Sequence, residues 1–271
     1  MFWRKKDKID PGWKWGALAA YIVMLIVNAL AGSTTLLGGV NTATVSDANP
    51  NLFAPAGLTF SIWGVIYLLL GLFVLRLFGL VGQKKSAVPS KDSGQVIKLF
   101  AISSLLNVAW LFAWQYQYLT LSVPLMISLL VVLAKIVELL RGTDMSLGES
   151  VTTKLPFSVY FGWISIATVA NITTWLVSIG WDGFGVREGV WMVAVLLVAT
   201  TIGIFVTLRN HDAAYLSVFV WAFAGILYKH LSGSGFDGAY PTTIVTLTIL
   251  LAVFLSLLVP MYRDAAMRLR G

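Results

Sequence analysis

The stretch that decides the fold spans residues 49–67 and reads NPNLFAPAGLTFSIWGVIY. Proline fixes φ and is tolerated only in the first turn of a helix, so Pro50 and Pro55 predict an extended approach followed by a helix start. At about 100° per residue, Phe60, Trp63 and Tyr67 then share one face. Beside them runs a stripe of small residues at seven-residue spacing: Gly57, Gly64 and Gly71. Small residues let a neighbouring backbone come close, so the pattern suits helix packing, and it also suits a helix whose rings line a pocket.

The composition is that of an integral membrane protein. Of the 271 residues, 58% are hydrophobic and 11% are charged, whereas soluble domains average about 45–50% apolar and about 25% charged residues. The mean hydropathy is +0.83. Cysteine is absent, which excludes disulfides, thiolate metal sites and a cysteine nucleophile. The net charge of +7 comes from cations in short loops beside apolar stretches, so we expect it to set topology, with no nucleic acid as partner.

The apolar residues fall into eight stretches, each close to the roughly 20 residues that a helix needs to cross a hydrocarbon core of about 30 Å. They lie near residues 15–37, 53–81, 96–117, 119–140, 155–179, 189–208, 213–231 and 240–261. Backbone polar groups must be paired inside the bilayer, and the runs are too long and too uniformly apolar for barrel strands. The sequence therefore predicts an all-α membrane protein with eight spans.

Lysine and arginine predict the orientation of these spans. With the N-terminus inside, all of the 19 cations except Arg187 and Lys229 fall on the inner side. The positive-inside rule then places both termini inside, and we expect a multi-pass protein of a bacterial or archaeal plasma membrane. A cleaved signal peptide is the alternative for the first stretch, with residues 29–31 before Gly32 as its cleavage site. The apolar run continues past that site, which favours a retained span.

Two loops stand out between the spans. The outer loop over residues 38–52 is rich in Thr, Asn, Gly and Ser and contains Asp47 as its one charged residue. Such a composition predicts an ordered or mobile lid and not a separate domain. The inner loop over residues 82–95 is polar and basic, so we expect a solvated connector.

Charged side chains inside a membrane usually mark proton or ion pathways, and they are scarce here. Lys135 and Glu138 lie three residues apart, which predicts a local ion pair, while Lys229 and His230 lie near a span end and are expected to snorkel. Neither His211 nor His230 lies mid-span, where an axial haem ligand is needed. The chain has no HExxH, GxSxG or P-loop pattern, so we expect no catalytic residue, metal site or cofactor.

Three asparagines lie inside spans: Asn28, Asn107 and Asn171. Asn107 shares a helical face with Trp110 and Trp114. A similar face on the fifth span carries Tyr160, Trp163, Ala167, Asn171 and Thr174. An amide in lipid is costly unless it is bonded, so these residues suit structural glue between helices. The converging faces also suit a cavity for a large, flat, mostly apolar ligand, with rings for stacking and amides to orient it.

These motifs resemble the TspO family of tryptophan-rich sensory proteins, which includes the mitochondrial translocator protein (peripheral benzodiazepine receptor). Residues 53–67 resemble its second-helix signature, and residues 106–110 (LNVAW) resemble its third-helix Leu-Asn-x-x-Trp motif. Pro156 through Trp163, followed by Ala167, Ala170 and Asn171, resemble its fifth-helix pattern. The resemblance covers about residues 14–181. It departs where Pro55-Ala56 replaces the family's usual paired prolines and where Ala170-Asn171 replaces Leu-Asn.

The resemblance implies a five-helix bundle, so we expect a TspO-like domain over residues 1–181 and a three-helix membrane extension over residues 182–271. It also implies a pocket that opens to the outer side between the first, second, third and fifth helices. Family members bind porphyrins and haem-pathway intermediates, sterols and synthetic isoquinolines. Carried over by motif position, the ligand-facing residues are Trp63, Tyr67, Asn107, Trp110, Trp163 and Ala167, and the helical faces add Phe60 and Asn171.

The first functional hypothesis is a membrane-embedded binding protein or sensor for tetrapyrrole, sterol-like or other flat apolar ligands. The second is a transporter that uses the last three spans, which the lack of ion-coupling residues and of an inverted repeat disfavours. The third is a light-dependent enzyme that degrades bound porphyrin, with Trp63 and Trp163 as redox-active side chains. A homodimer stays open, because the glycine stripe suits a second protomer as well as a neighbouring helix.

Overall fold

The computed structural model describes residues 11–34, 36–39, 42–81 and 90–268. Its described residues form helices and turns and contain no strand, which confirms the predicted all-α class. The basic tail before residue 11, the connector cations Lys84 and Lys85, and Arg270 lie outside the described residues. The inward orientation of both termini stays a prediction.

Among the described residues, eight helical stretches are long and apolar enough to cross a membrane, as the hydropathy predicts. The long helices are α1 (Pro11–Ser33), α3 (Ile62–Leu77), α4 (Ser90–Gln115), α5 (Leu119–Leu140), α7 (Leu155–Ser178), α8 (Glu188–Asn210), α9 (Ala213–Leu231) and α10 (Pro241–Arg268). The short elements are α2 (Thr42–Asp47), the 3₁₀ turn η1 (Gly57–Ser61), α6 (Leu147–Glu149), the π-helical turn η2 (Ser150–Lys154) and the 3₁₀ turn η3 (Gly183–Gly185).

Two helix starts differ from the predicted spans. The second span was expected from residue 53, but η1 begins at Gly57 and α3 follows it, because Ala56 is still extended at φ −61° and ψ 149°. Pro55 disfavours helical backbone at Ala54 before it, and the chain is extended at Ala56, but residues 51–54 form a hydrogen-bonded turn. The extended approach predicted from the prolines is therefore found only directly before η1. In contrast, α4 begins at Ser90, several residues before the expected start near residue 96. Its first turns are polar, so the apolar stretch did not indicate them.

The chain divides into two compact units, whose boundaries fall within α2, α3 and α7. The N-terminal unit comprises Met1–Thr42 and Gly64–Phe161, and the C-terminal unit comprises Ala43–Trp63 and Gly162–Gly271. The outer loop and the start of α3 therefore group with the last three spans. The domain boundary expected between residues 181 and 182 stays a prediction.

Within the N-terminal unit, α4 packs against both α1 and α5. Phe73 of α3, Phe100 of α4 and Phe157 of α7 form a triangle of rings whose centroids lie 4.9–6.0 Å apart. Gly71 is the one member of the glycine stripe that makes a close contact, because a Cβ there would lie 2.9 Å from the Tyr21 hydroxyl oxygen. At Gly57 and Gly64 a Cβ would meet no described atom within 4 Å beyond its chain neighbours and its own helix backbone, so among the described residues these two glycines make no close contact with another helix. Packing of the stripe on a second protomer stays a prediction.

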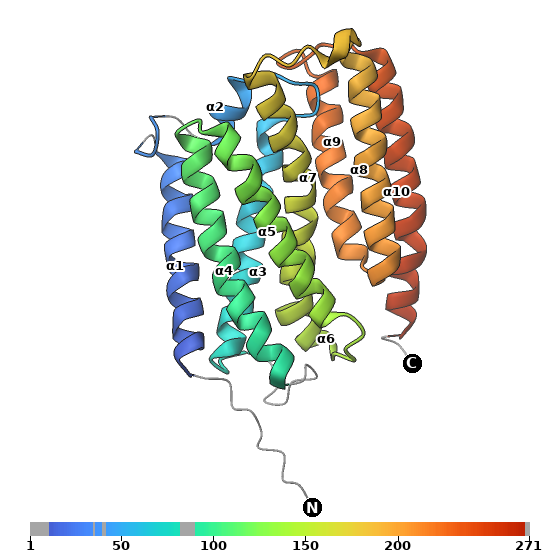
Figure 1. The fold of residues 1–271 in the computed structure, drawn as a ribbon. Coiled ribbons are helices and arrows are strands. Elements are labelled where there is room, and N and C mark those ends of the chain that lie inside the picture. The colour runs from blue at the N-terminus through green and yellow to red at the C-terminus, as the bar shows by residue number, and fades with distance from the viewer. Residues whose placement is uncertain (1–10, 35, 40–41, 82–89, 269–271) are drawn as a thin grey trace, which may run out of the picture. The chain divides into compact units, whose positions relative to one another are not determined.

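Within the C-terminal unit, α8, α9 and α10 lie side by side (Figure 1) and pack on one another. Phe219 and Phe223 of α9 contact Phe254 of α10 at centroid distances of 6.1 and 5.1 Å. A Cβ at Gly203 of α8 would lie 2.8 Å from the Phe219 ring, so glycine lets this ring pack directly on the backbone of α8.

A buried ion pair joins α3 to α6 in the N-terminal unit. Arg76 Nη2 lies 3.0 Å from Glu149 Oε1, and the two side chains are 10% and 6% exposed. Arg76 Nη1 also donates to Thr152 Oγ1 of η2 at 3.4 Å. Desolvating a charge is costly unless a partner compensates it, so these contacts fix the C-terminal part of α3 to the segment that starts the fifth span. From the sequence alone, Arg76 counts only among the inner-side cations, and Glu149 has no assigned role.

Replacing Glu149 by Ala should lower the free energy of unfolding by about 3–5 kcal/mol, because Arg76 is left buried and unpaired. The double variant Arg76→Met with Glu149→Leu should recover most of that loss, since both charges are removed together. Lys135→Ala, at an exposed pair, is the control and should cost about 0–1 kcal/mol. Thermal and denaturant unfolding in detergent measure the three values. Equal losses for Glu149→Ala and Lys135→Ala would contradict the expectation.

Candidate functional site

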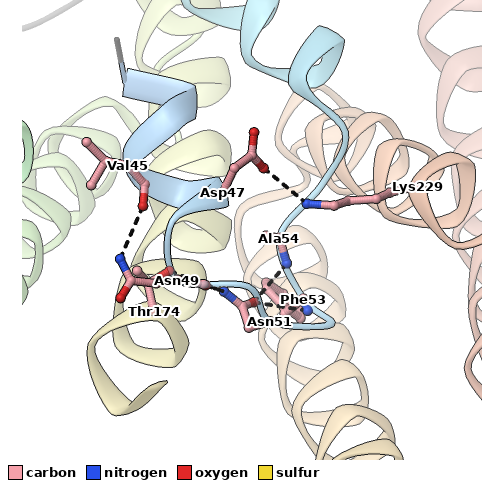
Figure 2. A network of polar contacts seen from close by, with 8 residues as sticks. All are labelled: Val45, Asp47, Asn49, Asn51, Phe53, Ala54, Thr174 and Lys229. Atoms are coloured by element: carbon pink, nitrogen blue, oxygen red, sulfur yellow. Dashed lines mark hydrogen bonds and ion pairs between the residues drawn. The ribbon is translucent and has the colours of Figure 1, made fainter. Parts of the chain in front are cut away.

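The segment that leads into α3 is held as a turn by Asn51. Its Oδ1 accepts hydrogen bonds from the backbone N–H groups of Phe53 (3.1 Å) and Ala54 (2.9 Å). Its Nδ2 donates to the carbonyl oxygen of Asn49 at 3.1 Å and to Thr174 Oγ1 of α7 at 3.3 Å (Figure 2). Asparagine side chains that bond the backbone two and three residues ahead build local turns. Residues 49–61, called the entrance segment below, are therefore ordered and attached to α7.

The outer loop and the entrance segment are also attached to the end of α9. Asp47 Oδ1 lies 3.4 Å from Lys229 Nζ (Figure 2), with Lys229 18% and Asp47 67% exposed. His230 Nε2 lies 3.0 Å from the carbonyl oxygen of Leu52. The His230 side chain is fully buried and lies against Phe236 at 4.7 Å between ring centroids, so the expectation that it snorkels is wrong.

Three rings gather where the entrance segment passes into α3. Trp163 of α7 contacts Phe60 of η1 at 5.9 Å between centroids and Trp63 of α3 at 6.2 Å. The interplanar angles are 85° and 83°, so both rings meet Trp163 edge to face. Trp163 is buried, whereas Phe60 and Trp63 are half-buried. Edge-to-face pairs are worth about 0.5–1.5 kcal/mol beyond area burial. Phe60, Trp63 and Trp163 are called the aromatic cluster below.

On α7, the face that carries Trp163 continues with smaller and polar residues. Ala167 and Asn171 follow at four-residue intervals, which places them on the same side of the helix. Ala167 is half-buried and Asn171 is buried. The row thus combines an aromatic ring, a small side chain and an amide within about two turns.

The candidate residues of the N-terminal unit form a separate hydrogen-bonded network. The Tyr67 hydroxyl donates to Asn28 Oδ1 at 2.5 Å, and Asn28 Nδ2 donates to Asn107 Oδ1 at 2.7 Å. The Tyr21 hydroxyl donates to the Tyr67 carbonyl oxygen at 2.8 Å, the contact that the missing Cβ of Gly71 permits. These bonds join α1, α3 and α4, which confirms the structural interpretation of Asn28 and Asn107. Ligand contact by Tyr67 and Asn107 stays a prediction.

Trp110, the other candidate on α4, also packs within the N-terminal unit. Its ring is buried and stacks on Trp114 at 5.8 Å and 30°. Trp114 Nε1 in turn donates to the Thr42 carbonyl oxygen at 3.1 Å. A ligand-facing role for Trp110 stays a prediction.

The candidate residues therefore fall into one set per unit. The structure brings Phe60, Trp63 and Trp163 into contact, and it connects Tyr67 to Asn107 through Asn28. The C-terminal unit holds Phe60, Trp63, Trp163, Ala167 and Asn171, and the N-terminal unit holds Tyr67, Asn107 and Trp110.

Sequence reasoning missed the residues that hold the entrance segment. Asn51 lies between the two prolines, and an asparagine in such a position is a turn signal that could have identified it. His230 was recognised only as a span-end residue, because no local pattern indicates its distant partner Leu52.

Some of the charged residues in the described spans form ion pairs, among them Arg76 with Glu149. Lys135 Nζ lies 2.8 Å from Glu138 Oε2, which confirms the predicted local pair. Within the described part of the chain, no three His, Asp or Glu side chains gather in an arrangement that could hold a metal ion.

Asn51→Ala should loosen the entrance segment, because the N–H groups of Phe53 and Ala54 lose their side-chain acceptor. Each lost bond is worth about 0.5–1.5 kcal/mol, so amide exchange of these residues should accelerate roughly two- to tenfold. Asn49→Ala is the matched control, since it retains the backbone carbonyl and the Asn51 side chain. Hydrogen–deuterium exchange of peptides over residues 49–61 measures both, and identical exchange in the two variants would refute the role of Asn51.

Tyr67→Phe should lower the free energy of unfolding by about 1–2 kcal/mol, because Asn28 Oδ1 loses a donor in a largely buried network. Tyr116→Phe is the control, since the Tyr116 side chain is 49% exposed. Denaturant unfolding in detergent compares the two. A loss for Tyr67→Phe no greater than that for Tyr116→Phe would show that this bond contributes little.

The comparisons with known proteins give one result. A family model described as TSPO-like protein matches residues 14–261, a range that includes most of the last three spans as well as the motifs above. No curated protein and no solved structure gave a match. Because the matched range covers far more than half of the chain, the protein belongs to the TSPO-like family.

Proposed function

We propose that this membrane protein binds a flat, mostly apolar ligand at the aromatic cluster, and that tetrapyrroles such as protoporphyrin IX are the ligand class. The observation that carries the proposal is the edge-to-face contact of Trp163 with both Phe60 and Trp63. Two half-buried rings, each nearly perpendicular to a buried third, supply aromatic faces at fixed angles. A flat conjugated ligand gains dispersion and stacking energy on such faces.

The neighbouring side chains on α7 support the same ligand chemistry. Ala167 takes little volume beside Trp163, and the buried amide of Asn171 supplies a polar group within an otherwise apolar row. Ligand sites typically combine apolar and aromatic walls with a few polar groups that fix orientation. The propionate or pyrrole groups of a tetrapyrrole could hydrogen-bond to the Asn171 amide, and that bond would fix the orientation of the ligand.

The ion pairs among the described residues favour a ligand-binding function over ion-driven transport. Arg76 pairs with Glu149, and Lys135 pairs with Glu138. A coupling residue must exchange an ion or proton during the cycle, and side chains held in ion pairs are poorly suited to that task. The transporter and the light-dependent enzyme are therefore secondary hypotheses, which the experiment below also separates.

The test is a titration of protoporphyrin IX, in the dark, against the protein in lipid nanodiscs, followed by the porphyrin absorbance. Wild type should saturate at micromolar ligand. Trp63→Ala combined with Trp163→Ala should raise Kd roughly 5- to 150-fold, since two stacking contacts of about 0.5–1.5 kcal/mol are lost. Trp15→Ala is the control, because Trp15 lies in the N-terminal unit and is 62% exposed.

Linear, variant-insensitive absorbance changes would mean partition into lipid and would overturn the proposal. Under illumination, a product with a new absorption spectrum would favour the enzyme. Porphyrin flux into protein-containing liposomes, beyond that of protein-free liposomes, would favour the transporter.

A further inference from the structure

The helix α9 makes a backbone-to-backbone contact with the entrance segment. A Cβ at Gly225 would lie 2.0 Å from Thr59 Oγ1 and 2.9 Å from Thr59 Cβ, so only glycine fits at this position. The Gly225 carbonyl oxygen accepts a hydrogen bond from the Ala56 N–H at 3.1 Å. One turn earlier, Trp221 Nε1 donates to the Thr59 carbonyl oxygen at 2.9 Å. Three contacts thus fix residues 56–59 against one turn of α9.

The same helix also packs closely on α7. A Cβ at Gly162 would lie 3.0 Å from the Tyr215 carbonyl oxygen and 3.0 Å from Val218 Cβ. The Tyr215 hydroxyl donates to Ser165 Oγ at 2.9 Å. The α9 residues in these contacts recur at three- and four-residue spacing, so they lie on one side of the helix. Their positions are Tyr215, Val218, Trp221 and Gly225.

Both contacts lie directly before a ring of the aromatic cluster. Thr59 precedes Phe60, and Gly162 precedes Trp163. Adjacent residues on a helix or 3₁₀ turn move together, because their backbone dihedral angles are fixed by the same hydrogen bonds. A shift of either contact with α9 therefore changes the distance and angle between Phe60 and Trp163.

We propose that α9 positions the aromatic cluster, with Gly225 and Trp221 as positioning residues that set the separation and angle of its rings. This gives the last three spans a role in the site. The effect on ligand affinity rests on the proposed function, whereas the effect on the rings does not. Neither residue is required to touch the ligand.

The test places 5-fluorotryptophan in the full-length protein in nanodiscs and follows the ¹⁹F resonances of Trp63 and Trp163. Assignment uses Trp63→Phe and Trp163→Phe. Gly225→Ala should shift both resonances by more than their linewidths without ligand, and it should raise the Kd for protoporphyrin IX about tenfold. Gly189→Ala on α8 is the matched control, because a Cβ there has no described atom within 4 Å, and it should leave both readouts unchanged.

Rescue separates positioning from general destabilisation. Thr59→Gly removes each Thr59 atom that the new Cβ would meet, so Thr59→Gly with Gly225→Ala should return the resonances toward wild type. Thr59→Ala retains Cβ and should rescue only in part. If Gly225→Ala does not give monodisperse protein, Trp221→Phe carries the test. It removes the indole N–H that donates to Thr59, together with part of the ring, and should shift the Trp63 and Trp163 resonances.

Folded Gly225→Ala, or Trp221→Phe in its place, with unshifted Trp63 and Trp163 resonances would overturn the proposal. Shifts caused by Gly225→Ala that Thr59→Gly does not reverse would also overturn it, because they would not come from the contact of the new Cβ with the Thr59 side chain. Shifted and rescued resonances in a protein that binds no porphyrin would support the positioning by α9 and refute the proposed ligand.

Discussion

The close contact between Gly225 of α9 and the entrance segment is the constraint on which the C-terminal unit depends. Helices in lipid gain little hydrophobic energy from meeting each other, because the tails are as apolar as leucine, so close packing and interhelical hydrogen bonds carry their association. A glycine backbone that accepts a hydrogen bond from Ala56, beside the indole of Trp221 that donates to Thr59, supplies both. In the entrance segment, which is not α-helical, the Ala56 N–H and the Thr59 carbonyl oxygen are therefore hydrogen-bonded to α9.

The amides of the chain serve two different purposes. Asn28 and Asn107 bond to each other and to Tyr67, which satisfies polar groups between helices and stabilises the N-terminal unit. Asn51 bonds backbone groups of its own turn and a threonine of α7, which fixes the start of a span. Asparagine thus joins helices in the N-terminal unit and shapes a turn in the C-terminal unit. An unbonded amide is costly inside a membrane, and Asn28 and Asn107 avoid that cost by bonding each other, whereas Asn51 lies in the loop before η1 and orders its own turn.

Hydropathy, proline chemistry and charge spacing predicted the eight spans, the extended backbone directly before η1 and the local pair Lys135–Glu138, because each depends on residues close in sequence. The pair Arg76–Glu149 and the contact of His230 with Leu52 join residues 73 and 178 positions apart, and no local pattern encodes them. Periodicity correctly placed Phe60 and Trp63 on one face, and the structure shows Trp163 against both. For the glycine stripe, periodicity predicted that the three glycines share a face, but it could not predict which residues would lie opposite that face. Among the three, Gly71 makes a close contact within the described residues.

The grouping of the chain follows from where these contacts lie along it. Residues 43–63 end two residues into α3, yet bonds from this segment go to α7 and α9, so it joins the C-terminal unit. Packing of α8, α9 and α10 on one another does not by itself require any contact with residues 52–59. Here α9 contacts that turn through Gly225, Trp221 and His230, which bond to Ala56, Thr59 and Leu52 in turn. Because these contacts involve residues 52–59, α9 holds the segment that leads directly into Phe60 and Trp63, which are two of the three rings of the aromatic cluster.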